Sequence, residues 1–180
     1  MKWASWAAPW SAVKKSPNPS ERERVLQPAK LARLLRGIKS RGGKVVFTNG
    51  VFDILHVGHA RYLAAARKCG SLLVVGMNTD SSVRRIKGPK RPIVPFSERA
   101  ELLASLKSVD FVVPFSDDTP LKLIMKIQPA VLVKGADWAK GEIVGGNEVE
   151  ENGGKVVRIR LARGRSTTNI VKKVVQRYSH

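Results

Sequence analysis

The amino-acid sequence predicts an α/β fold, in which a doubly wound parallel sheet of five strands forms a single domain. Short apolar runs alternate along the 180 residues with segments of helical period, which is the order of β-α-β units. The apolar runs contain few polar residues, as expected of parallel strands that are buried on both faces. No apolar run approaches the length of about 20 residues that a membrane span needs. A hydrophobic content of 43% fits a globular protein with one core.

The predicted elements follow one another in a regular order. Strands are expected over residues 44–48, 72–77, 111–114, 131–134 and 156–161. Helices are expected between them, at about 58–69, 97–107, 119–127, 145–152 and 166–176. A further helix begins at Pro28, because proline is favoured at the first helical position. Ser97 and Thr119 are the expected N-caps of two later helices, and Pro120 opens the second of these.

The N-terminus differs in composition from the rest of the chain. Residues 1–19 are expected to form a loosely ordered extension, and residues 20–180 to form the domain. The extension lacks the apolar core and cleavage site of a secretory signal. Its tryptophans, which are expected to pack on the domain, are Trp3, Trp6 and Trp10.

The charge balance is strongly basic. Lys and Arg total 33 against 14 acidic residues, a formal net charge of +19, and residues 152–180 contain no acid. Such a charge predicts an anionic partner: a phosphorylated metabolite, nucleic acid or a membrane surface. Because no RRM, KH or zinc-finger pattern accompanies the charge, we expect no stable nucleic-acid partner, and we expect no membrane partner. A single cysteine, Cys69, excludes an internal disulfide framework and predicts a cytoplasmic location.

Two histidines mark the most informative stretch, His56-Val57-Gly58-His59, which lies between the first predicted strand and a helical pattern. Histidines three residues apart at a helix start lie on one face. The free backbone N–H groups and the helix dipole attract an anion there. Gly58 has no side chain, so a phosphate can approach the backbone closely. The motif therefore predicts a phosphate site at the carboxyl end of the first strand.

Other polar segments are expected at the same edge of the sheet, because a Rossmann-like sheet binds ligands beyond the carboxyl ends of its strands. These segments are Asn78-Thr79-Asp80, Lys134-Gly135-Ala136-Asp137-Trp138 and Gly164-Arg165-Ser166-Thr167-Thr168. The last one opens a helix and offers a second phosphate contact. Loop cations, such as Lys87, Lys90 or Arg91, are candidates to hold the outer phosphates of a nucleotide.

This constellation fits nucleotidyl transfer. A phosphate oxygen of one substrate attacks the α-phosphate of a nucleoside triphosphate, and pyrophosphate leaves. The protein contributes alignment and charge neutralisation, which paired imidazoles and helix N–H groups can supply. Mg²⁺ is the expected cofactor, held mainly by phosphate oxygens and water, since no cluster of His or Cys predicts a metal site made by the protein.

Two segments resemble signatures of one family. His56–His59, preceded by Asn49-Gly50-Val51-Phe52-Asp53, resembles the HxGH signature of the cytidylyltransferase-like nucleotidyltransferases. Gly164–Thr168 resembles their second signature. The segments TNGVFDILH, VKGADW, NGGKVV and STTNIVKK are most similar to the adenylyltransferase domain of heptose biosynthesis. The similarity runs from about residue 28 to the C-terminus.

The resemblance implies a role for each matching residue. The residues expected to be catalytic are His56, His59 and Lys87. Those expected to bind the nucleotide are Asn49, Gly50, Phe52, Asp53, Gly58, Arg99, Gly135, Asp137, Ser166, Thr167 and Thr168. Those expected at the sugar phosphate are Asp53, Asp80, Lys134 and Trp138. Lys134 has a second interpretation, as a strand-end lysine that only reaches toward solvent, and Trp138 as part of the core or of a lid.

The implied reaction transfers AMP from ATP to D-glycero-D-manno-heptose 1-phosphate, giving ADP-heptose and pyrophosphate. The kinase that accompanies this domain elsewhere is expected to be a separate protein, and a homodimer is expected. One alternative is a CTP-dependent cytidylyltransferase for glycerol 3-phosphate or a related alcohol phosphate. Against it, Leu161 stands where cytidylyltransferases commonly have an arginine. The other alternative is a basic nucleic-acid-binding protein without catalysis.

Overall fold

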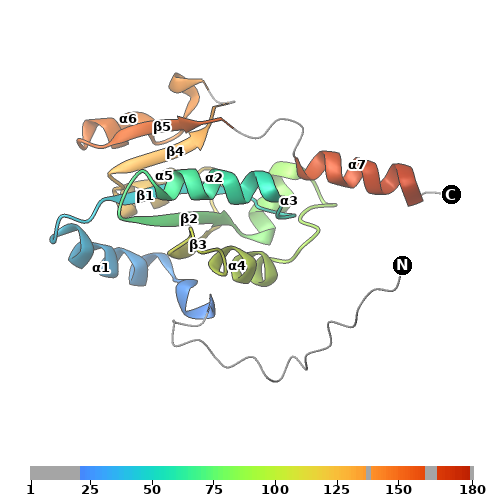
Figure 1. The fold of residues 1–180 in the computed structure, drawn as a ribbon, viewed down its shortest axis with the longest axis horizontal. Coiled ribbons are helices and arrows are strands. Elements are labelled where there is room, and N and C mark those ends of the chain that lie inside the picture. Colours follow the sequence, from blue (N-terminus) through green and yellow to red (C-terminus); the bar gives the residue numbers. More distant parts are fainter. Residues whose placement is uncertain (1–20, 137–138, 161–165, 179–180) are drawn as a thin grey trace, which may run out of the picture.

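A single parallel sheet forms the centre of the molecule. The computed structural model describes residues 21–136, 139–160 and 166–178. The strands are β1 (Val45–Gly50), β2 (Leu72–Asn78), β3 (Phe111–Phe115), β4 (Val131–Gly135) and β5 (Lys155–Ile159). They lie in the order β3-β2-β1-β4-β5, and every pair is parallel (Figure 1). The five-stranded doubly wound architecture predicted from the sequence is confirmed.

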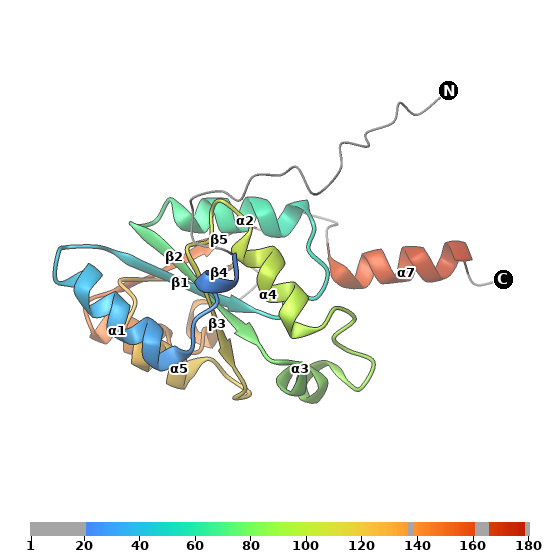
Figure 2. The ribbon, with the colours of Figure 1, turned by 90° about the horizontal axis from the view of Figure 1, so that it is seen from below.

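Helices cover both faces of the sheet. They are α1 (Pro28–Lys39), α2 (Val57–Arg67), α3 (Asp80–Lys87), α4 (Phe96–Ala104), α5 (Leu121–Ile127), α6 (Gly146–Glu151) and α7 (Thr167–Tyr178). Two short 3₁₀ helices, η2 (Glu21–Arg24) and η3 (Lys140–Glu142), complete the described elements. One hydrophobic cluster joins α1, α5 and α6 to the sheet, and a second joins α2 and α4 to its other face (Figure 2). The sheet therefore lies between two hydrophobic cores, one on each face.

Burial explains why the strands read as unbroken apolar runs. Every residue of β2 is buried, and so are the first four residues of β1. A helix layer on each face leaves no solvent side for alternating polar residues. The chain winds from β1 outward to β3 and then crosses to β4 on the other side of β1. The switch point thus lies between β1 and β4, where doubly wound sheets bind ligands.

Helix α3 is absent from the sequence-based prediction, which left Lys87 in a flexible loop. In the structure Lys87 is the last residue of this helix. Thr79 caps its start, its hydroxyl oxygen accepting a hydrogen bond from the Ser82 amide at 3.5 Å. Only Ser82 and Val83 are buried in α3, and its eight residues include just two apolar side chains, Val83 and Ile86, which are too few to mark a helix in the sequence.

The predicted N-caps of α4 and α5 are wrong by one or two residues. Helix α4 begins at Phe96 after Pro95, so Ser97 lies inside its first turn. Helix α5 begins at Leu121, and Pro120 takes the cap position expected for Thr119. In both helices the carbonyl oxygen of a proline accepts the first helical hydrogen bond, so the proline takes the N-cap position. The hydroxyl residues predicted as caps, Ser97 and Thr119, therefore do not occupy that position. Helix α1, in contrast, begins at Pro28 as predicted.

Within the ranges that the structure describes, no helix is long and apolar enough to cross a membrane.

Candidate active site

A cavity of about 870 Å³ lies beyond the carboxyl ends of β1, β2 and β4, at the switch point of the sheet. The sequence predicts thirteen of its lining residues: Asn49, Gly50, Phe52, Asp53, His59, Asn78, Lys87, Arg91, Lys134, Gly135, Ser166, Thr167 and Thr168. Residues from three strand ends and from the starts of α2 and α7 therefore meet around one space, as the parallel topology requires.

The turn after β1 contains a residue with a strained backbone, Phe52, and this backbone conformation sets the direction of its aromatic ring. Phe52 has a φ of +50°, in the left-handed region that costs a residue with a side chain about 1–2 kcal/mol. Its ring lies edge-on to the His59 ring, with centroids 5.2 Å apart. A Cβ on Gly50 would approach Phe52 Cε2 to 3.0 Å, so glycine is needed where the ring folds back. The turn thus packs Phe52 against the histidine that faces the cavity.

The two histidines lie on one face of the α2 start, as their spacing predicts. His56 is the N-cap of α2, and the His59 amide donates to its carbonyl oxygen at 2.9 Å. The rings stack with centroids 3.9 Å apart and planes inclined by 17°. His59 lines the cavity, whereas His56 and Gly58 support it from behind. His59 Nδ1 is buried and has no hydrogen-bond partner in the described part of the chain.

Burial, and secondarily the neighbouring His56, lowers the pKa of His59 to about 4. The imidazole is therefore neutral at pH 7. A polyanion in the cavity would favour the protonated form, because a nearby negative charge stabilises a cation. His59 can thus meet a phosphate either as a neutral hydrogen-bond donor or, after taking up a proton, as a cation.

Asp53 anchors the loop that closes one wall of the cavity. Its Oδ1 accepts hydrogen bonds from the Ile93 amide at 2.7 Å and the Val94 amide at 3.1 Å. Its Oδ2 accepts from Arg91 Nη1 at 2.5 Å. Burial acts to raise the pKa of Asp53, but the Arg91 and amide hydrogen bonds outweigh it and hold that pKa below its usual value. Arg91, a candidate phosphate ligand by sequence, is thus paired with Asp53.

Arg99 lies behind the cavity wall rather than on it. Its side chain is fully buried, and its guanidinium donates to the carbonyl oxygens of Val94 at 2.9 Å, Val51 at 2.5 Å and Asn78 at 3.1 Å. It also donates to Asp80 Oδ1 at 2.5 Å. These contacts join the ends of β1 and β2 to the loop before α4.

Asp80 completes this cluster. Its Oδ2 accepts a hydrogen bond from the Phe96 amide at 3.1 Å, so the carboxylate joins the start of α3 to the start of α4. Neither Arg99 nor Asp80 is a lining residue of the cavity. The structure therefore places both behind the substrate space, although the resemblance gives them contacts to nucleotide and sugar phosphate.

The start of α7 brings the second predicted phosphate turn to the cavity. Ser166, Thr167 and Thr168 all line the cavity, more than a hundred residues along the chain from His59. Ser166 Oγ accepts a hydrogen bond from the Asn169 amide at 3.1 Å, and Thr167 Oγ1 donates to the Ile54 carbonyl oxygen at 3.4 Å. The second contact ties the two turns together. Gly164 and Arg165 of this signature, with Asp137 and Trp138 of the β4 segment, lie outside the described residues.

Strand β4 meets β1 through a lysine. Lys134 Nζ donates to Asn49 Oδ1, so the lysine reaches across the switch point rather than toward open solvent. Its ammonium group lines the cavity with Lys87 and Arg91, which makes this space rich in cations. The carboxylates on the same wall already have partners, since Asp53 meets Arg91 and Asp118 meets Arg85 at 2.9 Å.

Sequence reasoning missed several lining residues: Val51, Tyr62, Val83, Ile86 and Asp118. Tyr62 shares a hydrogen bond of 2.7 Å with Thr48 and donates to the Val133 carbonyl oxygen at 3.2 Å. It thus fixes α2 against β1 and β4. It follows His59 by three residues, so the helical face rule that linked the histidines could have found it. The α3 residues could not be found because that helix was not predicted.

The described residues contain no group of three or more His, Cys, Asp or Glu side chains that could hold a metal ion.

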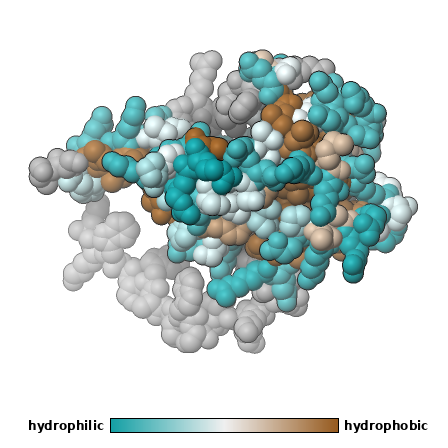
Figure 3. Space-filling model, turned by 180° about the vertical axis from the view of Figure 1, so that it is seen from behind, coloured by the Kyte–Doolittle hydropathy of each residue, from teal (hydrophilic) through white to brown (hydrophobic). Residues whose placement is uncertain are grey.

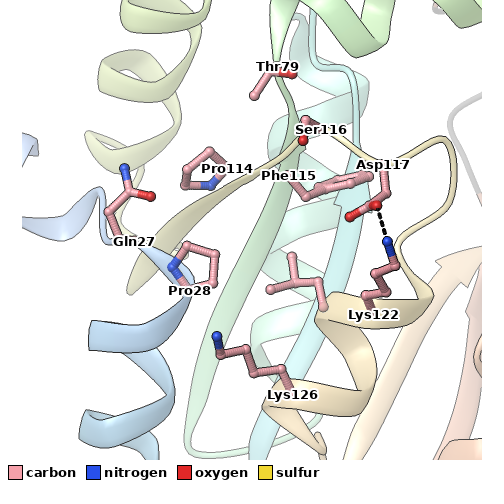
Figure 4. Close-up of a pocket in the computed structure, with 10 residues that line it drawn as sticks. Gln27, Pro28, Thr79, Pro114, Phe115, Ser116, Asp117, Lys122 and Lys126 are labelled. Carbon is pink, nitrogen blue, oxygen red and sulfur yellow. Dashed lines mark hydrogen bonds and ion pairs between the residues drawn. The ribbon is translucent and has the colours of Figure 1, made fainter.

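A second cavity, of about 430 Å³, lies between the start of α1, the end of β3 and α5 (Figure 4). Pro28, Pro114 and Phe115 line it, and Lys122 at its rim pairs with Asp117 at 2.8 Å (Figure 4). It contains no predicted site residue and no histidine, so the phosphate chemistry belongs to the larger cavity.

Comparison with known proteins agrees with the geometry. Residues 47–173 match the family model described as "Cytidylyltransferase-like". The chain is 51% identical over 148 residues to "Bifunctional protein HldE" of Geobacter metallireducens, and 54% identical over 144 residues to the protein of that name from Geotalea uraniireducens. These matches cover 82% and 80% of the chain but only 30% and 29% of the relatives.

A solved structure is also similar. The lipopolysaccharide core biosynthesis protein of Thermoplasma volcanium is 30% identical and superposes with a TM-score of 0.57. The match covers 69% of this chain and all of that one.

Proposed function

Because the chain belongs to the cytidylyltransferase-like family and is a nucleotidyltransferase, we propose that it transfers AMP from ATP to D-glycero-D-manno-heptose 1-phosphate. ADP-heptose and pyrophosphate are the products. One observation carries the proposal: two phosphate-binding turns, at the starts of α2 and α7, face a single cation-lined cavity. Such a cavity can hold a triphosphate and a second phosphorylated substrate together.

The reaction joins the two substrates directly. An oxygen of the sugar phosphate attacks the α-phosphorus of ATP, a P–O bond forms, and the bond to the leaving pyrophosphate breaks. No proton has to be abstracted from a phosphate dianion, so the protein needs no strong base. Its contribution is to hold the two phosphates in line and to offset charge that builds up around phosphorus.

His59 is proposed to contact the phosphates through its ring, held in place by His56 and Phe52. The backbone N–H groups at the start of α7, with the Ser166 and Thr168 side chains, are proposed to bind a second part of the triphosphate. Lys87, at the end of α3, is proposed to reach the outer phosphates. Each residue lines the cavity, and their charges and donors suit a polyanion.

Lys134 is proposed to meet the sugar phosphate. It stands at the end of β4, beside Asn49, on the part of the cavity wall formed by the switch point. The resemblance places Asp137 and Trp138, which follow it in sequence, in the same role. Asp53 and Asp80 are proposed to act by holding the loop and helix ends that shape this wall.

Mg²⁺ is proposed to enter with the triphosphate. The carboxylates of Asp53 and Asp118 already accept hydrogen bonds from arginines, so phosphate oxygens and water suit the ion better than these side chains. Bound in this way, Mg²⁺ neutralises charge on the leaving pyrophosphate.

A sugar kinase is proposed to supply the sugar 1-phosphate, and the protein is proposed to act as a homodimer in the cytoplasm. The curated relatives are more than three times as long as the matched segment, so their full activities are not transferred to this chain.

A substrate panel tests the proposal. Pyrophosphate release is measured with ATP or CTP, each combined with heptose 1-phosphate, glucose 1-phosphate or glycerol 3-phosphate. We expect turnover with ATP and heptose 1-phosphate. Turnover with CTP and glycerol 3-phosphate alone would replace the proposal with the cytidylyltransferase alternative.

Variants of the two turns test the mechanism. Loss of one preorganised donor lowers kcat by about 10²–10³-fold, which is the expectation for His59→Ala. Ser166→Ala should raise KM for ATP, whereas Ser97→Ala, which removes an exposed hydroxyl on α4, should change nothing. Full activity of His59→Ala would contradict the proposed role.

A further inference from the structure

Helix α7 has an apolar face that the rest of the domain leaves uncovered. The helix projects away from the body of the molecule beyond its first turn (Figures 1 and 2). None of its residues is buried. Val174 is 52% exposed, Val175 54% and Tyr178 76%. The view from the other side shows hydrophobic atoms on this projecting helix, between hydrophilic ones (Figure 3).

The two faces of α7 are cleanly separated. At about 100° per residue, the apolar side chains fall within an arc of about 140°. These side chains are Ile170, Val171, Val174, Val175 and Tyr178. The opposite face carries Lys172 and Lys173, Arg177 lies at the border of the apolar arc, and the helix contains no acidic residue. A helix of 12 residues is marginal in water unless its apolar face packs against something.

From this combination we propose that α7 binds the surface of an anionic lipid bilayer, lying in the headgroup region with its apolar face inward. An apolar stripe opposite a face of lysines and uncharged polar residues, without acids, is the pattern of interfacial helices, whose binding combines buried apolar area with attraction to anionic lipids. Ile170 and Val171 are half-buried, but Val174, Val175 and Tyr178 are exposed, so this part of the stripe can reach a flat surface. Binding of α7 to a bilayer does not depend on which substrates the cavity takes.

The other end of the chain has a matching composition. Residues 1–20 contain Trp3, Trp6 and Trp10, with Lys2, Lys14 and Lys15, and no acidic residue. Tryptophan favours the boundary between headgroups and acyl chains, and lysine favours anionic headgroups. The excess of positive charge, +19 for the whole chain, adds long-range attraction to such a surface.

Charge argues against two other occupants. A second copy packed on the apolar face of α7 would cover the stripe but leave the lysines of the opposite face without an anionic partner, since the helix has no acid. An RNA strand would suit the basic face but leaves the apolar stripe without a role. The sequence alone predicts no membrane partner; the exposed apolar side chains of α7 are the observation that leads us to propose one.

Vesicle flotation tests the proposal with the full-length protein. Vesicles of phosphatidylcholine alone are compared with vesicles that contain about 30% phosphatidylglycerol, a range that gives a strong negative surface potential. We expect flotation with the anionic vesicles only, and its loss at about 1 M salt, where screening is nearly complete.

Two matched variants separate insertion from charge. Val174→Asp and Gln176→Asp add the same negative charge to α7, on the apolar and the polar face respectively. Val174→Asp should weaken vesicle binding about tenfold more than Gln176→Asp, since only it places a carboxylate in the inserted face. Equal weakening by the two variants would overturn the inserted orientation.

A second pair tests the basic face. Lys172→Gln/Lys173→Gln should weaken binding by about fivefold per removed charge, the contribution of one cation near an anionic membrane. Lys30→Gln/Lys68→Gln removes the same charge from exposed positions on α1 and after α2, and should have less effect. Pyrophosphate release in solution should be the same for all of these variants, which separates this test from that of the proposed function.

Other outcomes would overturn the proposal. If the wild type ignores anionic vesicles and sediments as a dimer that Val174→Asp dissociates, a second copy covers α7. If it ignores vesicles but binds an RNA oligonucleotide through Lys172 and Lys173, the basic face serves nucleic acid.

Discussion

Arg99 offers the sharpest test of how the site is built. The resemblance implies that this arginine contacts the nucleotide. In the structure its guanidinium donates to four acceptors within the protein, and the residue does not line the cavity. The two roles respond differently to substitution. We therefore consider Arg99→Met, which preserves much of the side-chain volume and removes every donor.

The structure sets the size of the expected effect. Removing one partner of a buried ion pair costs about 3–5 kcal/mol. The Asp80 side chain is 29% exposed, so water can replace part of the lost contact and the lower half of this range applies. The three carbonyl oxygens that lose a donor each add about 1 kcal/mol where water cannot reach them. These contributions together span about 3–7 kcal/mol, so we expect Arg99→Met to lower the free energy of unfolding by at least about 3 kcal/mol.

Urea unfolding at 15 °C measures this change, with Arg61→Met on the exposed face of α2 as the control that loses the same charge. The control should stay within about 0.5 kcal/mol of the wild type. Arg99→Lys should recover less than half of the loss, because a single ammonium group cannot reach all four acceptors. ATP affinity is measured on the same samples under conditions where each variant is folded.

One result would refute the reasoning. If Arg99→Met stays within about 1 kcal/mol of wild-type stability and binds ATP at least a hundredfold more weakly, the arginine contacts the nucleotide and the cluster with Asp80 is incidental. A coupling free energy near zero between Arg99→Met and Asp80→Asn would argue the same way.

Four further results are expected. The free energy of unfolding should fall as pH decreases from 6.5 towards 4, because the unfolded chain protonates the His59 imidazole while the folded protein keeps it neutral; urea titrations at several pH values should show a flatter dependence for His59→Gln. For the same reason ATP binding near pH 6 should take up protons, which calorimetry in two buffers of different ionisation enthalpy detects; no uptake would mean that His59 stays neutral beside the phosphates. Asp53→Asn should loosen the 91–94 loop, raising its rate of proteolysis and lowering kcat/KM by about tenfold or more, and unchanged proteolysis would show that the loop is held by other contacts. EDTA should abolish pyrophosphate release, and Mg²⁺ should restore it; activity that persists in EDTA would exclude the proposed metal role.

The sequence predicted those parts of the fold that depend on local pattern. Strands buried on both faces appear as apolar runs, and Pro28 marks a helix start, so these features could be identified without coordinates. Helix α3 could not, because its few buried residues leave a polar sequence, and its position depends on contacts with β2 and the loop before α4.

The candidate site shows the same division. Residues that lie close together in the sequence, such as the two histidines, can be assigned to one face of a helix from their spacing alone. The gathering of α2 and α7 around one cavity followed from parallel topology. What spacing cannot show is which polar side chain faces the cavity and which lies behind it. Arg99 and Asp53 are residue types that often bind ligands. In the folded protein, however, Arg99 donates hydrogen bonds to carbonyl oxygens and Asp53 accepts them from amides, and folding alone brings these groups close.

The two edge strands of the sheet, β3 and β5, differ in how far their outer edges are covered. At β3 the outer border is partly occupied, since Val25 pairs with Val112 and the Leu26 amide donates to the Val112 carbonyl oxygen at 2.9 Å. At β5 no described strand pairs with the outer border, and the exposed side chains there are Lys155 and Arg158. Like charges on a bare border repel the same border of another molecule and prevent sheets from joining into aggregates. Part of the basic excess therefore opposes edge-to-edge pairing of two sheets through β5, the edge opposite β3.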